Sequence, residues 1–191
     1  MDSMQLTQST RVTRTSDASP KHRRRALALT TLAFLSLAAC GSDSVGPGGL
    51  GSGSITATGT VSTSGSGIAV FQSISSGGSS LFQVAIAPLS QSATTWTLQI
   101  ASYSGRPPVG TYQLSALSGS STDPTATFYY TSGGNMQMFN STSGQLVITS
   151  SSPSSVRGTF NFTGTDVSGG SGSVTAHGTF NAPCAPGTTC Q

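Results

Sequence analysis

Residues 156–164 read VRGTFNFTG, and apolar and polar side chains alternate along them. Val156, Phe160 and Phe162 share one face of an extended chain, because successive side chains of a strand point to opposite sides. A shorter echo, GTFN, occupies residues 178–181. We interpret the two segments as adjacent antiparallel strands with the same need for an inner and an outer face, and not as units of a repeat protein.

Short alternating segments continue away from this stretch, separated by residues rich in Gly, Ser and Pro. The nine or ten predicted strands are 55–61, 68–75, 81–87, 95–101, 111–115, 125–131, 136–139, 144–149, 156–164 and 174–182. Turn signals separate them, including Gly-Gly pairs at 77–78 and 133–134. The connectors are too short for helical crossovers, so the strands should pair antiparallel. The expected fold is all-β: a single antiparallel β-sandwich or an up-and-down, calycin-like β-barrel.

The charge of the chain is concentrated at its beginning. Six of the eight Lys and Arg residues precede Cys40, and the remainder keeps Arg106 and Arg157 against three aspartates, a formal charge of −1. The chain beyond Cys40 contains no Lys and no Glu. No basic patch is left to neutralise phosphates, so we expect no nucleic-acid partner.

A cationic block and an apolar run precede Cys40. Residues 21–25 read KHRRR, and the run at 26–39, about 14 residues, is too short to span about 30 Å of hydrocarbon as a helix. This arrangement is typical of a signal peptide. A loose twin-arginine pattern at 23–27 leaves the twin-arginine route open beside general secretion, which we favour.

The run ends in Leu37-Ala38-Ala39-Cys40-Gly41, which resembles the lipobox of bacterial lipoproteins. The resemblance implies cleavage before Cys40, a diacylglyceryl thioether on its sulfur and an acylated amine. Three acyl chains suit a stable membrane anchor, because one chain alone holds a protein only marginally. Gly41 stands where an Asp would favour the inner membrane in enteric bacteria, so we expect a lipid-anchored envelope protein with the outer membrane favoured.

These features divide the chain into four parts. We expect a signal peptide at 1–39, the lipidated Cys and a flexible Gly/Ser linker at 40–54, an antiparallel β domain at 55–183 and a C-terminal tail at 184–191.

Strand motifs of the β domain resemble those of an uncharacterised group of lipid-anchored all-β bacterial lipoproteins. The matching segments are PVGTYQL at 108–114, SGQLVIT at 143–149, VRGTFNF at 156–162 and GTFN at 178–181. The group's C-terminal half reads roughly GTY-L … SGTLTIT … VSGTFSFTA … GTFN. The resemblance implies an anchored β domain and supplies no catalytic residues.

The tail contains Cys184 and Cys190 on either side of a Pro-Gly turn signal, which should bring them together. Outside the cytoplasm the pair can oxidise, so we predict a disulfide that clips the tail locally. It would also resolve the odd count of three cysteines, with one lipidated and two paired. A metal site would need further ligands, and we expect none.

Few residues could support catalysis. His177 is the only histidine after Cys40, and the pattern places it on the wet face of its strand. A hydrolase would combine it with Asp123 or Asp166 and a serine, yet no nucleophile elbow selects a serine. Asp123 and Asp166 as a glycosidase pair sit in turn-like settings, which favour a structural role.

Three functions remain from the sequence. We favour a lipid-anchored, non-catalytic structural or interaction domain without cofactor. Its expected partner is the membrane, through the N-terminal lipid, and an envelope protein or a small lipophilic ligand remains open as a further partner. The alternative is a carrier of a small lipophilic ligand inside a barrel; a hydrolase is the third. The residues expected to line a carrier's cavity are Phe82, Trp96, Tyr112, Phe128, Phe160 and Phe162.

Overall fold

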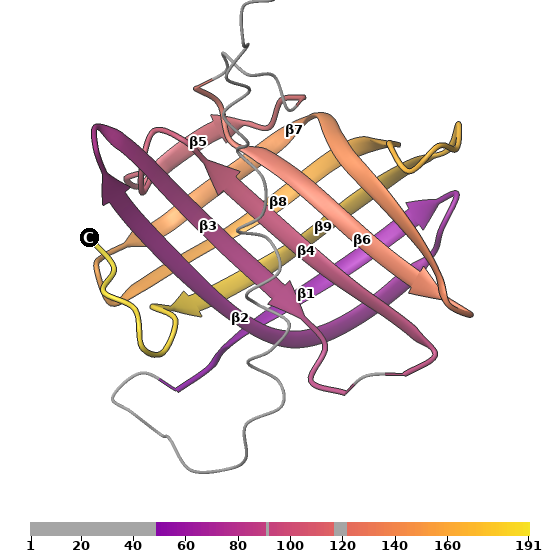
Figure 1. Ribbon diagram of the computed structural model, residues 1–191, viewed down its shortest axis with the longest axis horizontal. Helices are drawn as coiled ribbons and strands as arrows, with labels where there is room; N and C mark the ends of the chain where they lie inside the picture. The colour runs from indigo at the N-terminus through magenta and orange to yellow at the C-terminus, as the bar shows by residue number, and fades with distance from the viewer. Residues whose placement is uncertain (1–48, 91, 117–121) are drawn as a thin grey trace, which may run out of the picture. The chain divides into compact units, whose positions relative to one another are not determined.

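The computed structural model describes residues 49–90, 92–116 and 122–191, which form nine β-strands and no helix (Figure 1). The strands are β1 (Gly51–Gly59), β2 (Thr63–Ser76), β3 (Ser79–Ala87), β4 (Thr94–Ser102), β5 (Gly110–Gln113), β6 (Thr125–Ser132), β7 (Asn135–Ser151), β8 (Ser155–Asp166) and β9 (Ser173–Pro183). The predicted signal peptide, Cys40 and the first part of the linker lie outside the described residues.

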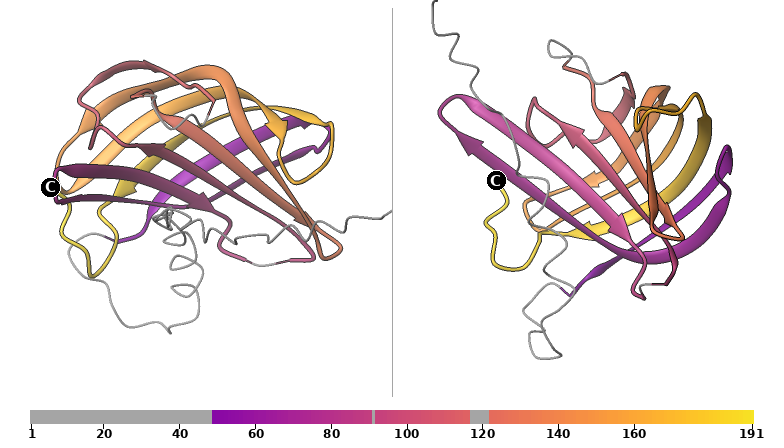
Figure 2. Two further views of the ribbon diagram at one scale, coloured as in Figure 1. Left: turned by 45° about the horizontal axis from the view of Figure 1, so that its top comes forward. Right: turned by 45° about the vertical axis from the view of Figure 1, so that its right-hand side comes forward.

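Eight of the strands close into an antiparallel barrel. Neighbouring strands follow the order β5-β7-β6-β4-β3-β2-β1-β9-β8, and β7 also pairs with β8, which completes the ring. Figure 2 shows the curvature of the wall of strands from two further directions. The predicted all-β fold is therefore confirmed, with the barrel in place of the sandwich. Closure pairs every long strand on both sides and leaves few free edges.

The hydrophobic core fills the inside of the barrel. Most inward positions of the long strands are occupied by apolar side chains. Large ones that are almost completely buried include Phe71, Phe82, Phe128, Phe139, Phe162, Ile86, Leu98, Ile100 and Leu146. The opening stretch behaves as predicted, since Val156, Phe160 and Phe162 on β8 face this core.

The echo of the opening stretch produces a reciprocal pattern across β8 and β9. Gly158 is opposite Phe180, and Phe160 is opposite Gly178. A Cβ atom at Gly178 would lie 2.7 Å from Cζ of Phe160, and one at Gly158 would lie 2.9 Å from Cζ of Phe180. Each ring therefore occupies the space that a glycine leaves on the neighbouring strand, which allows a narrow barrel to hold large rings.

Two tight hairpins follow the predicted Gly-Gly signals. Gly77 and Gly78 between β2 and β3 have φ of 60° and 83°, and Gly133 and Gly134 between β6 and β7 have φ of 57° and 82°. Positive φ at both central residues is the geometry whose twist matches that of the flanking strands. The prediction of these two turns is confirmed.

Two glycine-rich segments that looked like connectors belong to strands. β1 begins at Gly51, before the expected start at residue 55, and β2 begins at Thr63, before the expected start at residue 68. Gly53 and Gly67 are opposite each other on the inner face of these strands. A Cβ atom at Gly53 would lie 2.5 Å from Cγ2 of Ile86. Glycine here makes room inside the barrel. From composition alone, a glycine-rich strand of this kind cannot be distinguished from a glycine-rich linker.

The predicted strands 136–139 and 144–149 are one strand, β7. The register against β8 shifts between Ser141 and Ser143, so a bulge bends β7 without ending it. Gly144 has a φ of 145°, and its positive φ suits the bend. The polar run 140–144 has the composition of a turn, because bulges and turns both favour glycine and small polar residues.

β5 and β6 pair with the same edge of β7. β5 is opposite Ile148 to Gln145, and β6 is opposite Asn140 to Asn135, so the two strands run in line along that edge. The connection between β5 and β6 is closed at its base by a hydrogen bond of 3.1 Å, which the amide of Ser115 donates to the carbonyl of Pro124.

Candidate functional site

The residues considered for catalysis are not brought together. His177 is exposed on the outside of β9, opposite Asn161 on β8. Asp166 ends β8, five residues beyond Asn161, which is about 16 Å at 3.3 Å per residue. Asp123 precedes β6, whose direction matches that of β8, so it lies at the other end of the barrel from Asp166.

Asp166 organises the turn between β8 and β9. Its Oδ1 accepts a hydrogen bond of 2.7 Å from the amide of Ser168 and another from the hydroxyl of the same residue. These hydrogen bonds to Ser168 lower the pKa of Asp166 below its ordinary value, because they favour the charged carboxylate. The predicted turn role fits this geometry.

Five of the six residues expected to line a carrier's cavity lie inside the barrel. Phe82, Phe128, Phe160, Phe162 and Trp96 are buried members of the core. Tyr112 differs, because it is only partly buried at the edge of the core and its hydroxyl donates to the carbonyl of Pro108 at 2.8 Å.

The interior side chains pack against one another. The ring centroids of Phe128 and Phe139 are 6.2 Å apart, and those of Phe160 and Phe162 are 6.3 Å apart. Distances of this size are typical of packed aromatic pairs. Among the described residues we find an open depression of about 350 Å³, which lies at the β1–β2 turn and is lined by Thr56, Ala57, Thr58, Ser62, Thr63 and Ser64.

The outside of the barrel has two different walls. The outward residues of β1, β8 and β9 form a hydroxyl wall, which is polar throughout: Ser52, Ser54, Thr56, Thr58, Arg157, Thr159, Asn161, Thr163, Thr165, Thr175, His177, Thr179 and Asn181. Neighbouring hydroxyls interact across it, as the 3.1 Å hydrogen bond between Ser54 Oγ and Thr179 Oγ1 shows.

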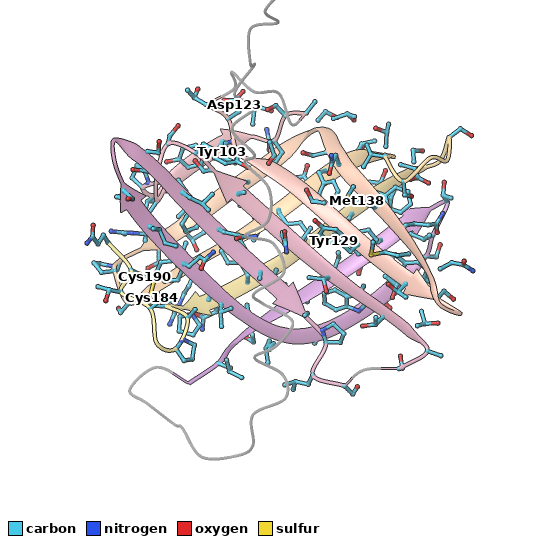
Figure 3. The ribbon with its side chains drawn as sticks, in the orientation of Figure 1. Tyr103, Asp123, Tyr129, Met138, Cys184 and Cys190 are labelled. Carbon is cyan, nitrogen blue, oxygen red and sulfur yellow. A yellow bond between two sulfur atoms is a disulfide. The ribbon has the colours of Figure 1, made fainter. Side chains whose placement is uncertain are left out.

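The outward residues of β2, β3, β4 and β6 form a mixed wall of apolar, amide and hydroxyl side chains. Val70 is only 9% exposed, and Gln72 donates to Gln83 across the strands at 3.1 Å. Tyr129 and Met138 lie side by side at its border with β7 (Figure 3). Burial raises the pKa of Tyr129, because it disfavours the charged phenolate.

The C-terminal tail carries the predicted disulfide. Cys184 and Cys190 are bonded, with Cα atoms 6.0 Å apart (Figure 3). The tail also contacts residues that sequence reasoning missed. The amide of Ala185 donates to the carbonyl of Phe71 at 2.7 Å, and Nε of Arg106 donates to the carbonyl of Gln191 at 3.3 Å. The only signal for Arg106 was its place before the rigid Pro107-Pro108 connector.

The described ranges contain no group of three or more side chains suited to hold a metal ion. The same part of the chain has no helix with the length and hydrophobicity needed to cross a bilayer. Comparison of the chain with protein families, with curated proteins and with solved structures finds no match.

Proposed function

We propose that this chain is a membrane-anchored lipoprotein of the bacterial cell envelope, and that its barrel is a non-catalytic structural or interaction domain. The observation that carries the proposal is the segment from Lys21 to Gly41: a cationic block, an apolar run of signal-peptide length and the sequence LAAC-G. Cys40 is its lipidation site, and the outer membrane is the favoured location.

The barrel is suited to a position beside a membrane on a tether. Its largest apolar side chains are buried inside, and the outer faces of β1, β8 and β9 form the polar hydroxyl wall, whereas strands that cross a bilayer carry an apolar band around the whole outside. β1 begins eleven residues after Cys40. A Gly/Ser-rich chain of that length has an average end-to-end distance of about 17–20 Å if it behaves as a random coil, which is long enough for a tether.

The separation of His177, Asp123 and Asp166 favours a non-catalytic role. Acid–base or nucleophilic catalysis needs its groups within hydrogen-bond reach, about 2.6–3.2 Å, of one another or of one reacting atom. Loss of a hydrolytic activity on His177→Ala, in a variant with unchanged circular dichroism, would overturn this part of the proposal.

The carrier alternative stays a prediction. A carrier needs an open volume of several hundred Å³, about 300–1,000 Å³ for ordinary ligands, whereas rings and aliphatic side chains occupy the inward positions described above. Titration of the purified protein with fatty acids and sterols, followed through the fluorescence of Trp96, tests it directly. A saturable change at micromolar ligand would favour the carrier.

Metabolic labelling with an alkyne palmitate tests the anchor. The wild-type chain should incorporate the label and fractionate with the envelope, and Cys40→Ala should lose both properties. The matched control is the Cys184→Ala/Cys190→Ala double variant, which should keep the label because its cysteines are in the tail. An unlabelled wild-type chain of full length in the cytosol would contradict the proposal.

A further inference from the structure

The barrel wall has a seam at the end where β1 starts. β1 pairs with β2 only as far as Gly51, opposite Ala69, and with β9 as far as Ser52, opposite Asn181. β2 continues to Ser76 and β9 continues to Pro183. Beyond the start of β1, these two strands therefore face each other with no strand between them.

The C-terminal tail closes this seam. Cys184 forms a parallel bridge with Phe71 of β2, and the amide of Ala185 donates to the carbonyl of Phe71. Ala185 is 3% exposed and Cys190 is 7% exposed, so the tail is packed onto the barrel. The C-terminal segment lies beside β2 in the views of Figure 1 and Figure 2.

The seam covers an aromatic pair. Phe71 and Phe82 are fully buried, with ring centroids 5.9 Å apart, and Phe71 is the β2 residue to which the tail is bonded. Removal of the tail would leave the backbone of Phe71 without its partner on that side and would admit water to the two rings. The described residues offer no other strand to take its place on this side of Phe71.

Few groups attach the tail to the barrel, and the disulfide is not one of them, because it joins two residues of the tail itself. The amide of Cys184 donates to the carbonyl of Ser154 at 3.0 Å, and Arg106 reaches Gln191 from the β4–β5 connector. Residues 186–189 of the loop between the cysteines are exposed. Segments with little buried surface open locally at low free energy. The cross-link restricts the open forms of the tail and holds the buried Cys190 beside Cys184, which bridges Phe71, so it favours the closed form.

We propose that the Cys184–Cys190 disulfide is a redox-controlled latch on the barrel seam. A thiolate of a dithiol reductant attacks Sγ of the partly exposed Cys184, the S–S bond breaks, and Sγ of Cys190 leaves as a thiolate and takes up a proton. The second thiol of the reductant then displaces Cys184, so that the reductant becomes a disulfide and the tail becomes a dithiol. Without the cross-link, Cys190 is no longer held beside Cys184, so the tail opens more readily at Phe71 and uncovers the seam between β2 and β9. The latch needs no lipid anchor, so its test is separate from that of the proposed function.

Hydrogen exchange of the full chain, followed by mass spectrometry in the oxidised and reduced states, tests the latch. Reduction should speed exchange in peptides covering 70–76 and 184–191 by about tenfold or more, the size expected for loss of a short cross-link. Peptides from β8 should be unchanged. Maleimide labelling of Cys184 and Cys190 verifies reduction, and reoxidation should restore the slow exchange.

Trp96 separates opening of the seam from unfolding of the barrel. It is the only tryptophan of the chain and lies near Gly65, toward the opposite end of the barrel from the tail. Its emission should stay unchanged on reduction. A chain truncated after Pro183 should show fast exchange at 70–76 without reductant. Unchanged exchange at 70–76 after verified reduction, or a red shift of Trp96 emission, would overturn the latch.

Discussion

At the scale of single residues, the close packing of the narrow barrel depends on those inward glycines at which any side chain would collide with a neighbour. A Cβ atom at Gly178 would lie 1.9 Å from the backbone carbonyl oxygen of Ser54, besides its approach to Phe160. Backbone cannot move aside as a flexible side chain can, so the strand itself would have to shift. Gly178 therefore sets how closely β9 approaches β1, while the Gly–Phe pairs fill the space between β8 and β9.

Gly178→Ala should lower the free energy of unfolding by about 1–3 kcal/mol, the usual cost of overpacking a core. The measurement is urea unfolding followed by circular dichroism. Gly65→Ala is the matched control, because Gly65 also faces inward and a Cβ atom there would lie 3.4 Å from Nε1 of Trp96, an ordinary contact. Equal effects of the two substitutions would contradict the packing argument.

Asp166 should make the stability of the folded chain depend on pH in the acidic range. Its pKa is lowered in the folded state by the hydrogen bonds from Ser168, so the carboxylate is held better there than in the unfolded chain. The stabilisation is present above the unfolded pKa, about 4, and is lost as the pH falls through the lower folded pKa. The melting temperature of the wild type should therefore fall relative to that of Asp166→Asn below about pH 4, with a constant difference between pH 5 and pH 7. A constant difference down to pH 2 would refute the coupling.

At the scale of elements, one serine joins the two strands that share an edge of β7. The hydroxyl of Ser141 donates to the carbonyl of Ser115 at 2.6 Å and accepts from the amide of Ala126 at 2.9 Å. Ser141 is 1% exposed. The Ser141 side chain thus satisfies one backbone group after β5 and one in β6, at the two ends of the connection between these strands.

Ser141→Ala should lower the free energy of unfolding by about 1–3 kcal/mol, because the buried amide of Ala126 and the partly buried carbonyl of Ser115 both lose the hydroxyl to which they are hydrogen-bonded. Hydrogen exchange at the amide of Ala126 should accelerate with it. Ser143→Ala is the control, since Ser143 is exposed on the same strand beyond the bulge. A stability loss without faster exchange at Ala126 would point to a cause other than this contact.

Local patterns in the sequence predicted the strands and turns, whereas they did not predict how strands distant in the sequence pair with one another. Alternation placed Phe160 and Phe162 inside, and the Gly-Gly signals placed two hairpins, because both depend on neighbouring residues only. The bulge in β7 and the start of β1 at Gly51 were missed, because glycine serves turns, bulges and close packing alike. The disulfide was predicted from a local turn, whereas the seam against Phe71 depends on where β1 stops.

At the scale of the whole molecule, the proposed mature chain would carry no primary amine. It contains no Lys after Cys40, and acylation would block the amine of Cys40 itself. A succinimidyl ester should therefore leave the envelope form unlabelled, whereas an uncleaved Cys40→Ser precursor should react at Lys21 and at its N-terminus. Intact mass spectrometry reads out both forms. A labelled mature chain would mean that cleavage occurs without acylation of the amine.

The hydroxyl wall has a consequence for the behaviour of many copies at one surface. Electrostatic repulsion between copies is weak, because the chain beyond Cys40 has two arginines and three aspartates. Salt screens only electrostatic interactions, which are few between these chains. Crowded barrels should therefore remain separate through bound water and closed strand edges, and sedimentation should be the same in dilute buffer and in concentrated brine.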